Sequence, residues 1–240
     1  MFYYLAEPRL TWNLLLIAAA IIPAVFLMIK VYQSDRLEKE SGLLIWQLVK
    51  AGILSSLIAM VAERILSYML NEAVPQSSAA YDVLLYFIVV AVSEESAKYL
   101  MLKRNTWRSP EFNCMYDGVV YAVFISLGFG LWENISYVLT YGLSTAVVRA
   151  VTAIPGHACF GVFMGVFYAI AKKYEVEGFE NDSRIYRVIS VLVPVLLHGA
   201  YDYIASTYTS GWYFVIFVAA LFAVSFILVS KKAKSDRYIQ

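Results

Sequence analysis

The chain has 240 residues, of which 61% are hydrophobic and 15% charged, and its formal net charge is +1. Soluble globular domains are about 45–50% apolar and about 25% charged, so a soluble core of this size cannot hold the excess of apolar side chains. The near-neutral charge offers no strongly basic surface, which argues against a nucleic-acid partner. Lipid must therefore be the solvent for much of the chain.

The first apolar run follows a short polar leader. Residues 1–9 include Glu7 and lack the basic segment that precedes the apolar part of a signal peptide. The run behind them, about Leu10–Tyr32, is long enough to span, because a hydrocarbon core of about 30 Å needs about 20 helical residues. We therefore expect this segment to remain as a membrane-spanning helix.

Apolar stretches of spanning length recur along the chain between short polar breaks. Only helices satisfy their own backbone hydrogen bonds in lipid without closing a barrel, and these stretches are too long for barrel strands. The sequence therefore predicts an all-α, polytopic transmembrane helical bundle of about seven spans. The predicted spans are about Leu10–Tyr32, Leu43–Tyr68, Tyr81–Leu102, Met115–Leu139, Ala146–Ala171, Ile185–Ser206 and Trp212–Ser230.

Basic residues alternate between the two sides of the predicted bundle. Lysine and arginine occur in the first, third and fifth breaks and in the C-terminal tail, whereas the second, fourth and sixth breaks hold none. Because these residues accumulate on the cytoplasmic side, the N-terminus is predicted outside and the C-terminus in the cytoplasm. We interpret Lys50, Arg64 and Arg149 as side chains that reach the interface from near helix ends.

No linker or internal repeat separates a second domain. We therefore predict a single integral-membrane domain over residues 1–240, with its functional core at about 81–206. The two cysteines, Cys114 and Cys159, do not form a CxxC pair, and we interpret both as small packing residues.

The third predicted span contains three ionisable residues in the stretch VVAVSEESAKYLML. A charge at mid-bilayer is costly, about 2.5–3.5 kcal/mol on insertion scales, so such residues are informative. Glu94 and Lys98 are four apart and share a helix face, and Glu95 is three from Lys98. One glutamate–lysine pair would indicate a simple structural ion pair. Because one lysine cannot neutralise two carboxylates, we favour a general-base role for one of them.

The fourth predicted span reads GFGLWENISY and carries Glu133 and Asn134 nearer its outer end. Gly128 and Gly130 allow a neighbouring helix to approach closely or the helix to bend. Glu133 is explained either by a polar contact between helices or by a second carboxylate at the same cavity. The residues alone leave both interpretations open.

The fifth predicted span reads AIPGHACFGVFMG and places His157 just after Pro155. A proline inside a helix removes a backbone hydrogen bond, so we expect a kink that opens space around the imidazole. Gly161 and Gly165 form a GxxxG pattern, which is typical of a close-packing face. A lone histidine here is equally explained by a hydrogen bond to a neighbouring helix.

The sixth predicted span reads PVLLHGAYDYI and carries the second of the chain's two histidines. His198 and Asp202 are four apart, so their side chains lie on one helix face. The aspartate can orient the imidazole, or both can ligate a metal. At 1.5 Å per residue, Glu94, His157 and His198 are expected within about one or two helical turns of one depth. Such a cavity suits metal-assisted or glutamate-driven hydrolysis.

The ordered set EExxK, EN, a buried histidine and HxxxD resembles the PrsW family of bacterial intramembrane proteases. The resemblance covers about Tyr81–Tyr203. The family is distantly related to the prenyl-CAAX endopeptidases and the Abi immunity proteins, which use a glutamate pair, FxxxH and HxxxN. Asp202 stands at the last position of HxxxN, as in the PrsW branch. Ala153 stands where FxxxH has phenylalanine, so His157 is assigned by order and depth.

The resemblance implies an endopeptidase of the bacterial plasma membrane that performs site-1 cleavage of a single-span anti-sigma factor in a stress response. Glu94 or Glu95 would supply the water-activating carboxylate. His157 and His198 would stabilise the oxyanion or bind metal, and Asp202 would hold His198. The supporting residues would be Lys98, Glu133 and Asn134. A zinc site built from Glu94, His157, His198 and Asp202 and a metal-free glutamate mechanism are equally compatible with these residues.

Three other functions fit parts of the pattern. Intramembrane carboxylates and histidines also serve proton- or ion-coupled transporters, although the odd span count and the lack of an inverted repeat disfavour this. A non-catalytic membrane scaffold or immunity protein would use the same fold to bind a partner. A peptidase for prenylated or other peptides is the third alternative.

Overall fold

The computed structural model describes residues 3–207 and 211–239. The start of the polar leader and the centre of the sixth break lie outside the described residues. The helices are α1 (Tyr3–Ser34), α2 (Gly42–Ala73), α3 (Tyr81–Val83), the π-helix η1 (Leu84–Ala91), α4 (Val92–Thr106), α5 (Asp117–Tyr141), α6 (Leu143–Val151), α7 (Ala153–Val176), α8 (Glu180–Thr207) and α9 (Gly211–Lys234). Among the described residues, extended pairing is confined to one antiparallel bridge between Cys114 and Tyr238.

The predicted bundle of about seven spans is confirmed. Six helical segments are long and apolar enough to cross a membrane: Thr11–Ser34, Gly42–Ala73, Asp117–Tyr141, Leu143–Val176, Glu180–Thr207 and Gly211–Lys234. The remaining predicted span is formed by α3, η1 and α4, which follow one another without a break and carry Glu94, Glu95 and Lys98 in their interior. The side of the membrane on which each terminus lies stays a prediction.

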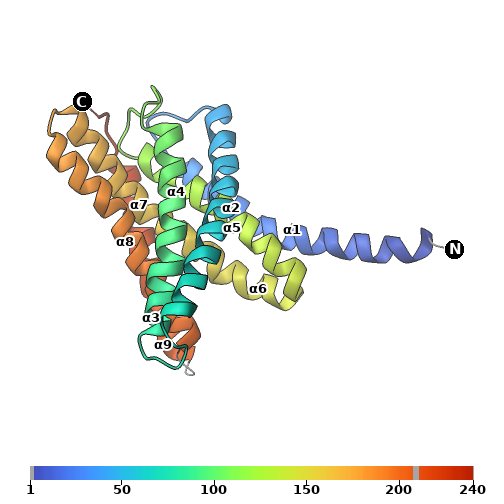
Figure 1. Cartoon of the computed structure of the whole chain (residues 1–240). Coiled ribbons are helices and arrows are strands. Elements are labelled where there is room, and N and C mark those ends of the chain that lie inside the picture. Colours follow the sequence, from blue (N-terminus) through green and yellow to red (C-terminus); the bar gives the residue numbers. More distant parts are fainter. Residues whose placement is uncertain (1–2, 208–210, 240) are drawn as a thin grey trace.

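The fifth predicted span differs from the structure in two respects. It begins inside α6, which ends at Val151 and lies at a steep angle to α7, as Figure 1 shows. Pro155 is the third residue of α7, so the predicted proline kink is wrong. A proline in the first helical turn removes an amide that has no partner inside the helix, and it therefore leaves the helix straight. His157 consequently lies in the second turn of α7.

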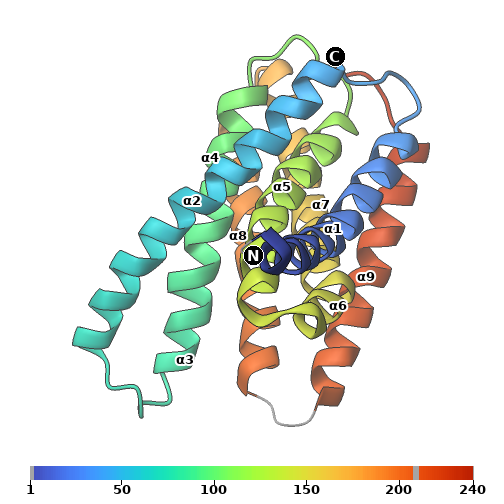
Figure 2. The ribbon, with the colours of Figure 1, turned by 90° about the vertical axis from the view of Figure 1, so that its right-hand side faces the viewer.

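Helix α5 lies at the centre of the bundle, with α1, α2 and α7 around it (Figure 2). Glycines let these helices approach at backbone distance. A Cβ atom at Gly165 would lie 2.3 Å from the Gly118 carbonyl oxygen, and one at Gly128 would lie 2.5 Å from the Val49 carbonyl oxygen. The predicted close packing at the GxxxG pattern is therefore confirmed.

The two ends of the bundle differ in what they carry. The α1–α2 connection, the segment 107–116 and the C-terminal tail lie at one end, whereas α3 and α6 lie at the other (Figures 1 and 2). Cys114 and Cys159 are both buried and free, as expected for packing residues.

Candidate intramembrane active site

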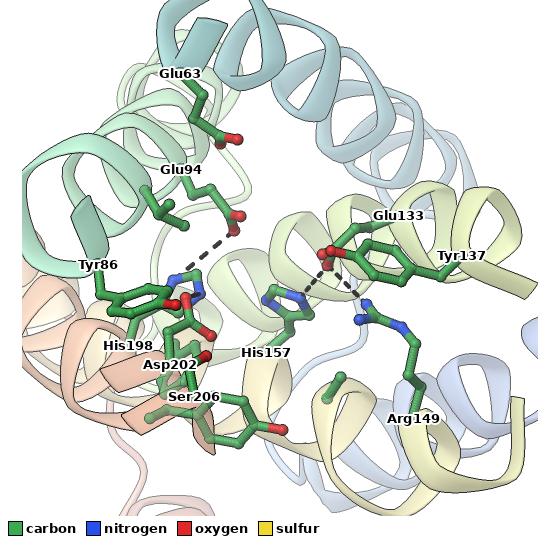
Figure 3. Close-up of a pocket in the computed structure, with 14 residues that line it drawn as sticks. Glu63, Tyr86, Glu94, Glu133, Tyr137, Arg149, His157, His198, Asp202 and Ser206 are labelled. Atoms are coloured by element: carbon green, nitrogen blue, oxygen red, sulfur yellow. Dashed lines mark hydrogen bonds and ion pairs between the residues drawn. The ribbon is translucent and has the colours of Figure 1, made fainter. Parts of the chain in front are cut away.

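A polar cavity of about 390 Å³ lies in the half of the bundle that carries α3 and α6. Ionisable side chains from α2, α4, α5, α6, α7 and α8 point into it (Figure 3). These are Glu63, Glu94, Glu133, Arg149, His157, His198 and Asp202. The structure thus brings together groups that the sequence distributes over five predicted spans. Charged groups in a membrane helix bundle face such an interior cavity because lipid would not solvate them.

The ammonium group of Lys98 lies between the carboxylates and the first imidazole. Its Nζ atom is 3.1 Å from Glu94 Oε2, 2.8 Å from Glu95 Oε1 and 3.2 Å from His157 Nδ1. The Phe129 ring closes the remaining side, with its centroid 4.0 Å from Nζ. The side chain is fully buried, so these contacts replace water for the buried charge. Lys98 therefore connects the glutamate pair of α4 with the histidine of α7.

The imidazole of His198 is held by carboxylates at both ring nitrogens. Nδ1 lies 2.9 Å from Glu95 Oε1, and Nε2 lies 3.3 Å from Asp202 Oδ2. The second contact is the pair expected from the four-residue spacing on α8. The Phe160 ring stacks on the imidazole with centroids 4.8 Å apart and an interplanar angle of 20°. Together these contacts set both the position and the plane of the ring.

The hydrogen bonds of His157 assign its tautomer. An ammonium group only donates hydrogen bonds, so Nδ1 must accept from Lys98. The proton of a neutral ring is then on Nε2, which donates to Glu133 Oε2 at 2.8 Å. Gly130 provides the space for this ring, since a Cβ atom there would lie 2.7 Å from the imidazole Cδ2 atom. Glu133 of the fourth span thus contacts the same cavity as Glu94.

Arg149 has a different role from the one expected. Its Nη2 atom lies 2.9 Å from Glu133 Oε2, and its Nε atom donates to Asn134 Oδ1 at 3.0 Å. The interpretation of Arg149 as a side chain that reaches the interface is therefore wrong. The steep angle between α6 and α7 directs it inward, where a carboxylate compensates its charge. Asn134 also donates to the Ala20 carbonyl oxygen at 2.9 Å, so it lies behind the cavity and supports Arg149.

The two adjacent glutamates have different access to the cavity. Glu94 lines it, whereas Glu95 is fully buried behind it. Glu95 Oε1 contacts Lys98 and His198, and its Oε2 atom has no hydrogen-bond partner in the described part of the chain. The structure thus separates two residues that spacing alone left equivalent.

Three of these residues form a compact set of possible metal ligands. One ligand atom each of Glu94, Glu95 and His198 lies within 4.8 Å of the others. Two carboxylates and an imidazole suit zinc, and the unpartnered Glu95 Oε2 is a free acceptor. The expected set differs, because it included His157 and Asp202 in place of Glu95. In the structure, both nitrogens of His157 face other side chains, and Asp202 contacts His198 from behind.

Sequence reasoning missed Glu63 and Phe160. Glu63 lies inside α2 and lines the cavity beside Glu94 (Figure 3). The rule that flagged the other carboxylates, an acidic residue well inside a span, would have found it. No sequence signal marks Phe160, whose stacking on His198 depends on the packing of α7 against α8. Lys50 and Arg64 are both exposed on α2, and their interpretation as side chains that reach the interface stays a prediction.

A membrane helix bundle that encloses carboxylates and imidazoles in a polar cavity has the groups that an intramembrane hydrolase needs. Residues 40–229 match the family model described as PrsW family intramembrane metalloprotease. The chain therefore belongs to the PrsW family. It is a multi-pass membrane protein and an intramembrane endopeptidase.

Curated relatives agree with this assignment over most of their length. The chain is 33% identical to Protease PrsW of Geobacillus kaustophilus over 207 residues, which cover 86% of this chain and 87% of that protein. It is 32% identical to Protease PrsW of Oceanobacillus iheyensis over 197 residues, 81% of this chain and 85% of that protein. For Protease PrsW of Bacillus subtilis the identity is 30% over 228 residues, 94% and 98% of the two chains. No solved structure matches the chain.

Proposed function

We propose that this endopeptidase performs site-1 cleavage of a single-span anti-sigma factor on the extracytoplasmic side of the bacterial plasma membrane. The observation that carries the proposal is the position of the cavity, in the half of the bundle away from the C-terminal tail. The alternation of basic residues predicts that this tail is cytoplasmic, which puts the cavity in the extracytoplasmic half. A peptide bond just inside or beyond the outer interface would then reach Glu94.

Glu94 is the general base of the proposed reaction. It lines the cavity, and its carboxylate can take a proton from a water molecule as that water attacks the scissile carbonyl carbon. The same carboxyl then gives the proton to the departing amine nitrogen. Lys98, 3.1 Å away, keeps the carboxylate in place for both transfers. Glu95 is the positioning residue, because it is buried behind the cavity and contacts Lys98 and His198.

His198 is the proposed donor to the oxygen anion that forms on the attacked carbonyl, through Nε2, which would exchange its longer contact with Asp202, at 3.3 Å, for one with that anion. Donors placed in advance toward a developing charge in a water-poor site stabilise it more than bulk water does. Asp202 and Glu95 hold the ring at its two nitrogens, and Phe160 holds its plane. His157 acts from the opposite wall, where Glu133 and Arg149 orient it.

The family description as a metalloprotease and the ligand set of Glu94, Glu95 and His198 support a bound zinc ion. In that form Glu94 and Glu95 would hold the ion, and the role of Glu94 as a free general base belongs to the metal-free mechanism. Zinc would polarise the scissile carbonyl and lower the pKa of a bound water molecule. Lys98 already compensates one of the two glutamate charges, so a metal-free glutamate mechanism is the alternative. The two differ in their response to a chelator.

The direct test uses the purified full chain in detergent with a candidate single-span anti-sigma factor, with and without a zinc chelator. Mass spectrometry of the fragments gives the cleaved bond. We expect a cut near the extracytoplasmic end of the substrate span, abolished by Glu94→Gln and reversibly by the chelator. Glu180→Gln is the matched control, because Glu180 is an exposed carboxylate far from the cavity.

The outcomes separate the parts of the proposal. Cleavage of other single-span proteins but not of an anti-sigma factor would overturn the substrate class. A cut on the cytoplasmic side would overturn the orientation, and cleavage that survives exhaustive chelation would favour the metal-free mechanism. Ion-coupled uptake into proteoliposomes without any peptide product would support the transporter alternative instead.

A further inference from the structure

A second cluster of buried carboxylates lies at the end of the bundle opposite the catalytic cavity. Asp35 and Glu40 belong to the connection between α1 and α2, and Asp117 is the first residue of α5. One oxygen atom from each lies within 4.8 Å of the other two. The three residues are only 3%, 5% and 2% exposed, respectively. None of them takes part in the proposed peptidase chemistry.

Backbone hydrogen bonds explain part of this cluster. Asp117 Oδ2 accepts from the backbone nitrogens of Asn113 and Cys114, at 3.0 and 2.6 Å. That contact shapes the segment before α5 and needs no ligand. Nearby, Asp236 Oδ1 in the C-terminal tail accepts from the backbone nitrogen of Tyr116 at 2.8 Å. These hydrogen bonds account for one carboxylate oxygen of Asp117 and one of Asp236. They do not account for the second oxygen of either residue, or for the carboxylates of Asp35 and Glu40.

Several polar atoms of the cluster are buried and unpartnered. Asp35 Oδ2 and Asp236 Oδ2 have no hydrogen-bond partner among the described residues. Neither does the hydroxyl group of Tyr121, which is fully buried and lies next to the Glu40 carboxyl. Buried polar atoms in proteins are nearly always satisfied by protein, water or an ion. Three buried oxygen atoms at this place, on Asp35, Asp236 and Tyr121, thus have unused hydrogen-bonding capacity.

The described basic side chains form no ion pair with this cluster, although the charge of Lys39 acts on Asp35. In residues 3–207 and 211–239, no lysine or arginine forms an ion pair with Asp35, Glu40 or Asp117. The neighbouring Lys39 directs its ammonium group to the backbone carbonyl oxygens of Tyr32 and Asp35.

We propose that Asp35, Glu40 and Asp117 form a binding site for a hard divalent cation, magnesium or calcium, with Tyr121 and Asp236 at its edge. Carboxylate and other oxygen ligands are the ones these two cations prefer. The bound cation would join the α1–α2 connection to the start of α5 and the C-terminal tail. Hydrogen bonds already link the same segments, for example from Asn113 Nδ2 to Glu38 Oε1 at 3.0 Å. The cation would therefore strengthen an existing junction.

The test measures cation binding on the purified full chain in detergent after removal of bound metal with EDTA. A Glu94→Gln background removes one carboxylate of the intramembrane ligand set, and the substitutions described next distinguish the second cluster from the carboxylates that remain at the cavity. Titration calorimetry and tryptophan-fluorescence melting are followed with magnesium and, separately, calcium. We expect a saturable rise in Tm with at least one of them.

Substitutions then locate the site. Asp35→Asn and Glu40→Gln are each expected to weaken the apparent Kd at least tenfold and to abolish the rise in Tm. In EDTA the same variants should melt at or above the parent Tm, because neither carboxyl has an ion-pair partner among the described basic side chains that the substitution would remove. If the carboxylates had only a structural role, the substitutions would instead lower Tm by the same amount with and without the cation. Glu38→Gln is the matched control and should keep the parent Kd, since Glu38 lies in the same connection but outside the cluster.

Three results would overturn the site. The first is no calorimetric binding and no Tm response to either cation, which would mean that protons alone balance the cluster. The second is a cation response that persists unchanged in Asp35→Asn and Glu40→Gln. The third is a loss of stability in these variants that is the same in EDTA and in the cation.

Discussion

His198 Nδ1 lies 2.9 Å from Glu95 Oε1, although 103 positions separate the two residues in the chain. This contact joins α8 to α4, and Lys98 extends it to His157 on α7. Glu95 therefore contacts two groups of the site while it is itself shielded from the cavity. The relationship assigns different roles to two consecutive glutamates, one facing the cavity and one behind it.

The first prediction concerns Glu94, the proposed general base. Glu94→Gln removes the proton acceptor but keeps a side chain of the same shape, so kcat should fall by about 10²–10⁴-fold while the protein still inserts and folds. Steady-state cleavage of a single-span substrate in detergent measures this, and Glu180→Gln should retain the parent rate. Parent-like kcat in Glu94→Gln would assign the base to another residue.

The second prediction concerns the support of His198. Asp202→Asn keeps an oxygen acceptor for Nε2 but removes the negative charge, so we expect a loss of about 10–100-fold in activity, as for other groups that orient a catalytic or metal-bound histidine. Asp202→Ala removes the contact altogether and should lose more. The comparison of kcat and KM for the two variants checks this order. If Asp202→Ala and Asp202→Asn both kept the parent activity, the contact of Asp202 with His198 at 3.3 Å would contribute nothing.

The third prediction concerns the pair of Arg149 and Glu133, whose atoms lie 2.9 Å apart. Because each compensates the charge of the other in a low-dielectric site, Arg149→Met and Glu133→Gln should each impair activity, and the double variant should be no worse than the more damaging single variant. A double-mutant cycle on kcat/KM measures this coupling. The exposed pair of Glu180 and Arg184, 3.5 Å apart, serves as the control and should behave additively. Additive effects at Arg149 and Glu133 would refute the coupling.

The fourth prediction concerns the space that Gly130 leaves for His157. A methyl group there would lie 2.7 Å from the imidazole, so Gly130→Ala should displace the ring and lower kcat. The crowding should also cost about 1–3 kcal/mol of stability. Cleavage rates and thermal melting in detergent report the two effects. Gly211→Ala is the control, because nothing lies within 4 Å of a Cβ atom at that position. Unchanged activity in Gly130→Ala would show that the imidazole tolerates displacement.

The membrane spans and the order of the ionisable residues were predictable from the sequence. Both depend on local properties: the length of apolar stretches against the thickness of the bilayer, and the cost of a charge in lipid. The pairing of His198 with Asp202 was also predictable, since residues four apart share a helix face. The place of His157 in the site was expected, although α7 begins later than its apolar stretch suggested.

Contacts between helices were decided only by the tertiary structure. The rotation and tilt of each helix against its neighbours decide three features of the site. They set the pairing of Arg149 with Glu133 and the position of Glu63 at the cavity. They also decide that Glu94 faces the cavity while Glu95 lies behind it. The sequence specifies which face of a helix carries a side chain, but the packing of the whole bundle decides what that face meets. The carboxylate cluster of Asp35, Glu40 and Asp117 forms for the same reason, because folding brings a loop and a distant helix start to one place.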